Sequence, residues 1–297
     1  MSVHLLAIGL NYAGTNNALR GCVNDAQAWM QQFGPIAQSQ FMLTETEATK
    51  AGIVSAIAHT LSKLAAGDTA IITYSGHGTY IPDQSGDETD RRDEALCPYD
   101  LNKNLLLDDE LRDLLSQRAA GSRVLLITDC CHSGTMTRDV GLDTPDLSGL
   151  PRYVPFAELT ECMCAETVDR ITSQARAARS IEAPVDQTDL IHLAGCRDDQ
   201  VSYDATIGGK ACGAFTYFAI KALQARQSKG LTFAEWRDAV TPARLPSAQY
   251  PQSPVFNGPL SLIVPGFELD LPQTQSPGSQ VFAGKLDDGR KFELRIG

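Results

Sequence analysis

Two short polar blocks, Tyr74-Ser75-Gly76-His77-Gly78 and Asp129-Cys130-Cys131-His132-Ser133-Gly134, contain residue types that can do covalent chemistry. A cysteine thiol attacks a carbonyl carbon well only as its thiolate, and a nearby imidazole can accept the thiol proton at neutral pH. Each block follows an apolar run typical of a buried strand. In open α/β folds the carboxyl ends of strands are where reactive side chains gather. The pattern therefore indicates a cysteine nucleophile that meets a histidine at one edge of a sheet.

The histidine and the cysteine of these blocks each also have an ordinary structural explanation. A single histidine after a strand is commonly a packed or capping residue, and a single cysteine is commonly a small buried hydrophobe. The glycines on both sides of His77 favour a functional loop, because they let the backbone turn sharply and approach a ligand. His132 is an alternative base, but a residue next to its nucleophile in the chain usually points elsewhere. The sequence indicates no third member of a catalytic triad.

The elements that must position these blocks alternate between strand and helix. Strands are predicted at residues 3–9, 69–74, 123–128, 190–194 and 260–264, and helices from residue 24 and at 50–64, 112–118, 161–180 and 214–227. This alternation predicts an α/β fold with a mostly parallel central sheet flanked by helices on both faces.

Composition excludes several classes of function. With 297 residues, 43% of them hydrophobic, the chain can bury a substantial core. A net charge of -11 argues against nucleic acid and anionic membranes as partners. We find no signal peptide, no apolar run of the ~18 residues that a membrane span needs, and no disulfide framework, so we expect a cytoplasmic protein with reduced thiols. The run from Gly9 to Gly14 lacks the middle glycine of a dinucleotide loop, and no Cys-x-x-Cys spacing indicates zinc.

The chain is predicted to form one large domain with an extension. We place the domain at residues 1–265, with a long loop or processing region at about 139–189, since a long insertion after a nucleophile is often functional. Residues 266–297 are predicted to be a linker followed by a β-hairpin around Asp287-Asp288-Gly289.

The two polar blocks resemble those of metacaspases, the caspase-like cysteine peptidases, including their bacterial relatives. Further blocks extend the resemblance over residues 3–265, among them Gly21-Cys22-Val23-Asn24-Asp25-Ala26, Asp93-Glu94-Ala95-Leu96-Cys97, Leu107-Asp108-Asp109-Glu110-Leu111, His192-Leu193-Ala194-Gly195-Cys196, Gly213-Ala214-Phe215-Thr216 and Gln252-Ser253-Pro254. The resemblance implies a caspase-like fold, a monomer, Cys131 as nucleophile and His77 as general base and acid. It also implies an oxyanion hole made of the backbone N–H groups of Gly78 and Cys131.

The resemblance also implies a substrate preference. Metacaspases present carboxylates to a substrate Arg or Lys, and the matching residues here are Asp25 and Asp129, with Cys22 and Ser75 completing the pocket. A planar guanidinium can bond a carboxylate through two nitrogens. Asp25 has an alternative role as an acid in the first turn of a helix, where the dipole favours it. We expect cleavage after Arg or Lys rather than after Asp.

An acidic segment from Asp83 to Glu110 holds ten Asp or Glu residues against three Lys or Arg. Most such runs are simply solvated. The resemblance implies that Ca²⁺ is an activator, bound by aspartates that match Asp93, Asp108, Asp109 and Asp139. Carboxylate oxygens suit this cation.

Self-processing is the last property that the resemblance implies. The loop after the nucleophile offers four arginines to an enzyme that cleaves after basic residues: Arg152, Arg170, Arg176 and Arg179. The sequence as a whole predicts a Ca²⁺-stimulated cysteine endopeptidase. The alternative is a catalytically silent caspase-like adaptor or binding module.

Overall fold

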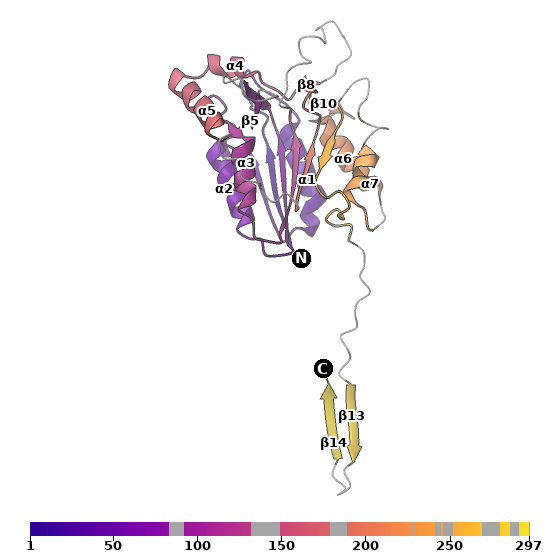
Figure 1. The fold of residues 1–297 in the computed structure, drawn as a ribbon. Helices are drawn as coiled ribbons and strands as arrows, with labels where there is room; N and C mark the ends of the chain where they lie inside the picture. Colours follow the sequence, from indigo (N-terminus) through magenta and orange to yellow (C-terminus); the bar gives the residue numbers. More distant parts are fainter. Residues whose placement is uncertain are drawn as a thin grey trace.

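A six-stranded sheet forms the centre of the molecule (Figure 1). The computed structural model describes residues 1–82, 92–131, 149–178, 189–226, 229–240, 245, 252–268, 280–285 and 291–296. The strand order is β12-β9-β7-β3-β1-β2. Five strands are parallel, and β12 at the edge is antiparallel. The strands are β1 (Val3–Gly9), β2 (Ser39–Thr44), β3 (Thr69–Ser75), β7 (Arg123–Asp129), β9 (Leu190–Ala194) and β12 (Val255–Asn257).

Helices cover both faces of this sheet, as the near-continuous apolar strands require. On one face lie α1 (Cys22–Phe33), α6 (Ala214–Ala225) and α7 (Phe233–Val240), and on the other α2 (Lys50–Leu61), α3 (Asp108–Ser116), α4 (Phe156–Glu161) and α5 (Ala165–Ala178). Successive residues of β7 alternate between the two cores: Leu125 packs on the α1 side and Leu126 on the α2 side. Two short 3-10 helices, η1 (Gly34–Ile36) and η2 (Glu45–Glu47), flank β2.

Within the part of the chain that the structure describes, three smaller sheets accompany the central one. The strands β4 (Gly78–Pro82), β5 (Arg92–Leu96) and β6 (Leu106–Leu107) form the first, and β8 (Leu150–Pro151), β10 (Tyr203–Ile207) and β11 (Lys210–Gly213) form the second. The third is an antiparallel pair, β13 (Gln280–Lys285) and β14 (Lys291–Ile296), in the region of the predicted hairpin. The division into a domain and an extension stays a prediction. Among the described helices, none has both the length and the apolar character that crossing a membrane requires.

The predicted α/β class is confirmed, and one predicted strand is wrong. Residues 260–264 form no strand, and the edge strand is β12 instead. The alternating Leu260, Leu262 and Val264 mimic a strand, but the carbonyls of Leu260 and Leu262 accept hydrogen bonds from the start of α7. The backbone of these residues therefore bonds to the first turn of α7 instead of pairing with a strand of the central sheet.

Two predicted helices have different bounds in the structure. The helix predicted at 112–118 begins earlier, at Asp108, because the acidic residues before it suit the first turn of a helix. The helix predicted at 161–180 corresponds to α5, which a turn at residues 162–164 separates from α4, and only Glu161 at the end of α4 falls in the predicted range.

Candidate active site

The two polar blocks lie side by side because β3 and β7 are neighbours in the sheet. Their register pairs Ser75 with Asp129, the last residues of the two strands. His77 and Cys131 each follow two residues later. The sheet thus brings the predicted base and the predicted nucleophile to one edge.

The imidazole of His77 is held by contacts on its ring and its backbone. Its Nε2 lies 2.8 Å from the carbonyl oxygen of Asn17, and its ring packs on Tyr12 with 5.0 Å between centroids. The hydroxyl of Tyr12 accepts the His77 backbone N–H at 3.0 Å. A carbonyl can only accept a hydrogen bond, so Nε2 carries the proton and Nδ1 keeps its lone pair. Nδ1 is buried and makes no hydrogen bond within the described part of the chain, which leaves it available as a base.

Burial sets the protonation state of this histidine. It lowers the pKa of His77 from 6.5 to about 4, with the Asn17 carbonyl opposing the shift and the Arg152 guanidinium adding to it. The ring is therefore neutral at pH 7, as a general base must be. Sequence reasoning missed Asn17, since a backbone carbonyl leaves no signature in the residue types.

The side chain of Cys131 is enclosed, with 1% of the residue exposed. A hydrogen bond with Cys131, together with burial, raises the pKa of Cys196 well above its usual value. Burial likewise raises the pKa values of Cys130 and Cys97 well above the usual value of a thiol. The surrounding cysteines are therefore protonated neighbours of Cys131, the predicted nucleophile.

A single carbonyl oxygen accepts hydrogen bonds from both backbone N–H groups that are predicted to form the oxyanion hole. The carbonyl oxygen of Arg152 accepts the N–H of Gly78 at 3.1 Å and the N–H of Cys131 at 3.2 Å. Backbone N–H groups that converge in this way stabilise an oxygen that becomes negative when its carbon is attacked.

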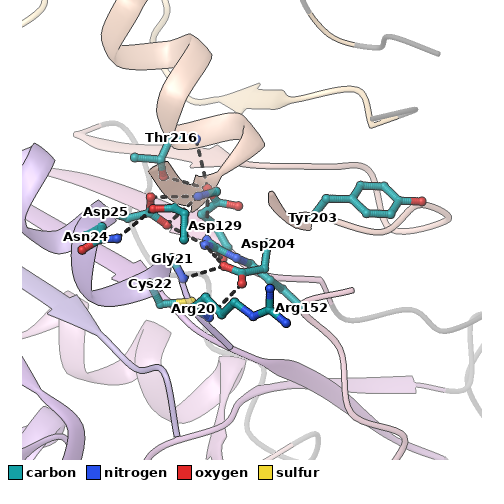
Figure 2. Close-up of polar contacts among 12 residues, drawn as sticks. Arg20, Gly21, Cys22, Asn24, Asp25, Asp129, Arg152, Tyr203, Asp204 and Thr216 are labelled. Atoms are coloured by element: carbon teal, nitrogen blue, oxygen red, sulfur yellow. Dashed lines mark hydrogen bonds and ion pairs between the residues drawn. The ribbon is translucent and has the colours of Figure 1, made fainter. Parts of the chain in front are cut away.

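The side chain of Arg152 enters an acidic pocket and is 0% exposed (Figure 2). Its Nη2 lies 2.7 Å from Oδ2 of Asp25 and 2.9 Å from Oδ1 of Asp204. Its Nη1 lies 3.2 Å from Oδ2 of Asp129 and donates to the backbone carbonyl of Asp129 at 3.1 Å. The pocket therefore presents three carboxylates to one guanidinium.

Fixed donors orient each of these carboxylates. Asp25 accepts the N–H of Gly213 at 2.8 Å. Asp129 accepts the N–H of Thr216 at 3.0 Å and its hydroxyl at 2.7 Å. Asp204 accepts the N–H groups of Arg20 and Gly21 at 2.8 and 2.9 Å. Each carboxylate of the pocket is thus held by hydrogen bonds that do not involve Arg152.

The charges in the pocket perturb one another. Burial raises the pKa of Asp25 to about 7; Arg152 opposes this shift and Asp129 adds to it. Burial also raises the pKa of the adjacent Cys22, again against the Arg152 charge. For Arg152 burial lowers the pKa, but Asp129, Cys22, Asp25 and Asp204 together raise it well above its usual value.

The structure therefore brings Cys22, Asp25 and Asp129 together, as the resemblance implies. Ser75 lies opposite Asp129 in the strand register and is buried. Sequence reasoning missed Asp204, which comes eight residues after the block that ends at Cys196. The sequence gives no sign that Asp204 faces the same pocket.

The predicted calcium ligands are only partly described. Partial burial, then the carboxylates of Asp109 and Glu94, raises the pKa of Asp108 to about 6, although the residue has considerable exposure. Asp109 forms an ion pair with Arg112, and Asp93 is buried on β5. Asp139 lies outside the described residues. Within the described ranges, no group of three or more acidic, His or Cys side chains is arranged to hold a metal ion.

The four arginines proposed for self-cleavage have different environments. Arg152 fills the pocket, whereas Arg170 lies on α5 and hydrogen-bonds to Asn104. The backbone of Arg176 belongs to α5, and Arg179 lies outside the described residues.

Comparisons with known proteins agree on one family. A family model described as "Metacaspase, peptidase C14 domain" matches residues 4–140. Metacaspase-1 of Ajellomyces capsulatus is 32% identical over 250 residues, which cover 74% of this chain and 70% of that protein. Metacaspase-1A of Aspergillus fumigatus is 30% identical over 254 residues, covering 74% of this chain, and the match spans 60% of that relative's length.

A solved structure gives the same result for the fold. The crystal structure of protein GSU0716 from Geobacter sulfurreducens superposes with a TM-score of 0.68 at 29% identity, over 91% of this chain and 99% of that chain. Sequence and structure thus agree over most of the chain, which belongs to the metacaspase family of C14 cysteine peptidases.

Proposed function

We propose that this chain is a cysteine endopeptidase that cleaves peptide bonds after Arg or Lys. One observation carries the proposal: a buried guanidinium pairs with three carboxylates while the carbonyl of the same residue bonds both N–H groups of the predicted oxyanion hole. A substrate residue on the acyl side of the cleaved bond, P1, needs this combination of side-chain and carbonyl recognition.

Three residues do the chemistry. Nδ1 of His77 accepts the proton of the Cys131 thiol, and the thiolate attacks the substrate carbonyl carbon. The N–H groups of Gly78 and Cys131 stabilise the resulting oxyanion, and removing one such donor typically costs about 2.7–4 kcal/mol of transition-state stabilisation. His77 then gives its proton to the departing amine, and water hydrolyses the thioester.

The pocket favours Arg over Lys and excludes Asp. A guanidinium presents several N–H donors in one plane and engages all three carboxylates, whereas an ammonium is a compact point charge. An Asp side chain would place a fourth negative charge among Asp25, Asp129 and Asp204. Like charges in a buried site repel strongly.

Fluorogenic peptides ending in Arg, Lys or Asp test this proposal, with Cys131→Ala as the inactive control. We expect turnover of the Arg peptide to exceed that of the Lys peptide, and no turnover of the Asp peptide. Activity that survives Cys131→Ala would refute the mechanism. Failure of a peptidyl-arginine inhibitor to label Cys131 in folded protein would favour the non-catalytic adaptor.

We also propose that Ca²⁺ stimulates the enzyme through the acidic segment. Burial and then the neighbouring carboxylates raise the pKa of Asp108, and a bound cation would oppose this shift. Oxygen donors of this kind fit Ca²⁺, which takes six to eight of them, so further ligands beyond Asp93, Asp108 and Asp109 are needed.

Calorimetric titration with Ca²⁺, beside peptidase assays with and without chelator, tests the calcium site. Asp108→Asn should weaken binding, while Asp113→Asn, an exposed acid on the same helix, should not. Equal binding by both variants would contradict the assignment.

A further inference from the structure

We propose that residues 150–154 are an internal substrate bound across the active site, and that the Arg152–Tyr153 bond is the one the chain cuts in itself. This inference rests on the proposed peptidase function. It selects one bond among the four candidate arginines and describes how the site is blocked until that bond is cut.

The chain before the bond binds as an added strand. β8 pairs antiparallel with β10, so that Pro151 lies opposite Tyr203 and Leu150 opposite Asp204. The N–H of Arg152 continues this ladder by donating to the carbonyl of Ser202 at 2.9 Å. Strand addition of this kind is a common way for proteins to hold an extended peptide.

At the bond itself, the backbone and the side chain of Arg152 are both engaged. A purely structural ion pair would require only the guanidinium. Here the carbonyl oxygen also bonds the N–H of the nucleophile, Cys131, and that of Gly78. Attack on this carbon would place the developing negative charge between two donors already in position.

The chain after the bond is held as well. The Tyr153 ring stacks on Tyr80, with 6.1 Å between centroids and an interplanar angle of 15°. The N–H of Val154 donates to the carbonyl of Gly78 at 3.1 Å. Contacts on both sides therefore fix the bond relative to Cys131.

The step is balanced within this chain and water. The Cys131 sulfur bonds to the carbonyl carbon of Arg152, its proton passing to His77, and the C–N bond to Tyr153 breaks as His77 protonates the new amine. Water then hydrolyses the thioester, which restores the thiol and leaves a carboxylate on Arg152. Before this step the pocket is full and Cys131 is 1% exposed, so external substrates are excluded.

Mapping the new N-terminus of the full-length wild-type chain by mass spectrometry tests the inference without any variant. We expect a fragment beginning at Tyr153, formed at a rate that does not change over about a hundredfold dilution, because an internal substrate is cut within one molecule. Arg152→Lys should retain this cut and Arg152→Gln should lose it. The matched control Arg170→Gln, on exposed α5, should be cut like the wild type.

Other outcomes overturn the inference. A first cut elsewhere, or a rate that rises in proportion to protein concentration, would refute it. Arg152→Gln also removes the guanidinium that anchors the segment in the acidic pocket, so external Arg peptides should displace the uncut segment and be turned over without a lag. If it does so but the wild type is never cut at residue 152, the internal substrate is wrong and the proposed peptidase stands. If folded protein cleaves neither itself nor any basic peptide, the proposed function fails.

Discussion

Asp204 offers the sharpest test of the pocket, because it joins the site without being indicated by the sequence. Its Oδ1 lies 2.9 Å from Nη2 of Arg152, and its two oxygens accept the N–H groups of Gly21 and Arg20. Asp204→Asn removes the charge and keeps one acceptor oxygen. The remaining carboxylates, Asp25 and Asp129, stay in place.

The size of the effect follows from these contacts. A hydrogen bond to a charged group contributes about 1.5–3 kcal/mol. Because Asn retains an acceptor, we expect the lower part of this range. A loss of about 1.5–2 kcal/mol corresponds to a fall in kcat/KM of roughly 10- to 30-fold for Arg peptides.

The assay compares Arg peptides with peptides carrying citrulline, the neutral isostere of Arg, at P1. Both enzymes carry Arg152→Gln so that the internal segment does not compete. Asp204→Asn should reduce the Arg-to-citrulline ratio of kcat/KM, and Asp198→Asn, an exposed acid on the preceding turn, should leave it unchanged.

An equal loss for Arg and citrulline peptides would show that Asp204 only shapes the pocket, and the charge argument would be refuted. An unchanged ratio would refute the assignment of Asp204 to substrate recognition altogether.

Three further predictions concern other parts of the site. Gly213→Ala should abolish cleavage after Arg without unfolding the chain, because a Cβ at this position would overlap a carboxylate oxygen of Asp129; normal kcat/KM in peptide assays would contradict this. Burial lowers the pKa of His77 from 6.5 in the unfolded chain to about 4 in the folded protein. As the pH falls from 6.5 to 4, the unfolded state therefore binds the proton first, and the free energy of unfolding decreases. In urea unfolding at several pH values, His77→Gln should make this decrease in the free energy of unfolding smaller by roughly 3 kcal/mol. The same pH dependence for the variant and the wild type would refute the pKa shift. Tyr80→Ala should reduce the preference for an aromatic residue after the cut about 2- to 10-fold, as stacking energies suggest, in quenched peptides with Tyr or Gly at the position of Tyr153.

The sheet and its reactive edge could be predicted because their signals are local. The runs Thr69–Tyr74 and Arg123–Thr128 are mostly apolar, as strands buried on both faces are, and each leads directly into one of the two polar blocks. The same reasoning failed at residues 260–264, where alternation is present but the backbone hydrogen bonds go to a helix end.

The side chain that occupies the pocket could not be predicted, because its position depends on contacts between residues far apart in the chain. Asp25 and Arg152 are 127 positions apart in the chain and meet only after folding. Asn17 acts through its carbonyl, which every residue possesses. Residue types indicated four possible arginines, and only contacts formed on folding distinguish Arg152: its ion pairs in the pocket, the hydrogen bonds to its carbonyl and the register of β8 on β10.

A segment attached to its own binding site differs from a separate inhibitor in how it responds to dilution. The covalent attachment of β8 to the rest of the chain fixes its local concentration at the active site, whatever the concentration of the protein. Lowering the amount of enzyme does not release the segment, and external peptides must compete with this constant concentration. Cutting one bond removes the attachment on one side, after which the segment can be displaced. The time at which a molecule becomes accessible to external peptides would thus depend on when it cuts its own bond, and not on the concentration of the protein.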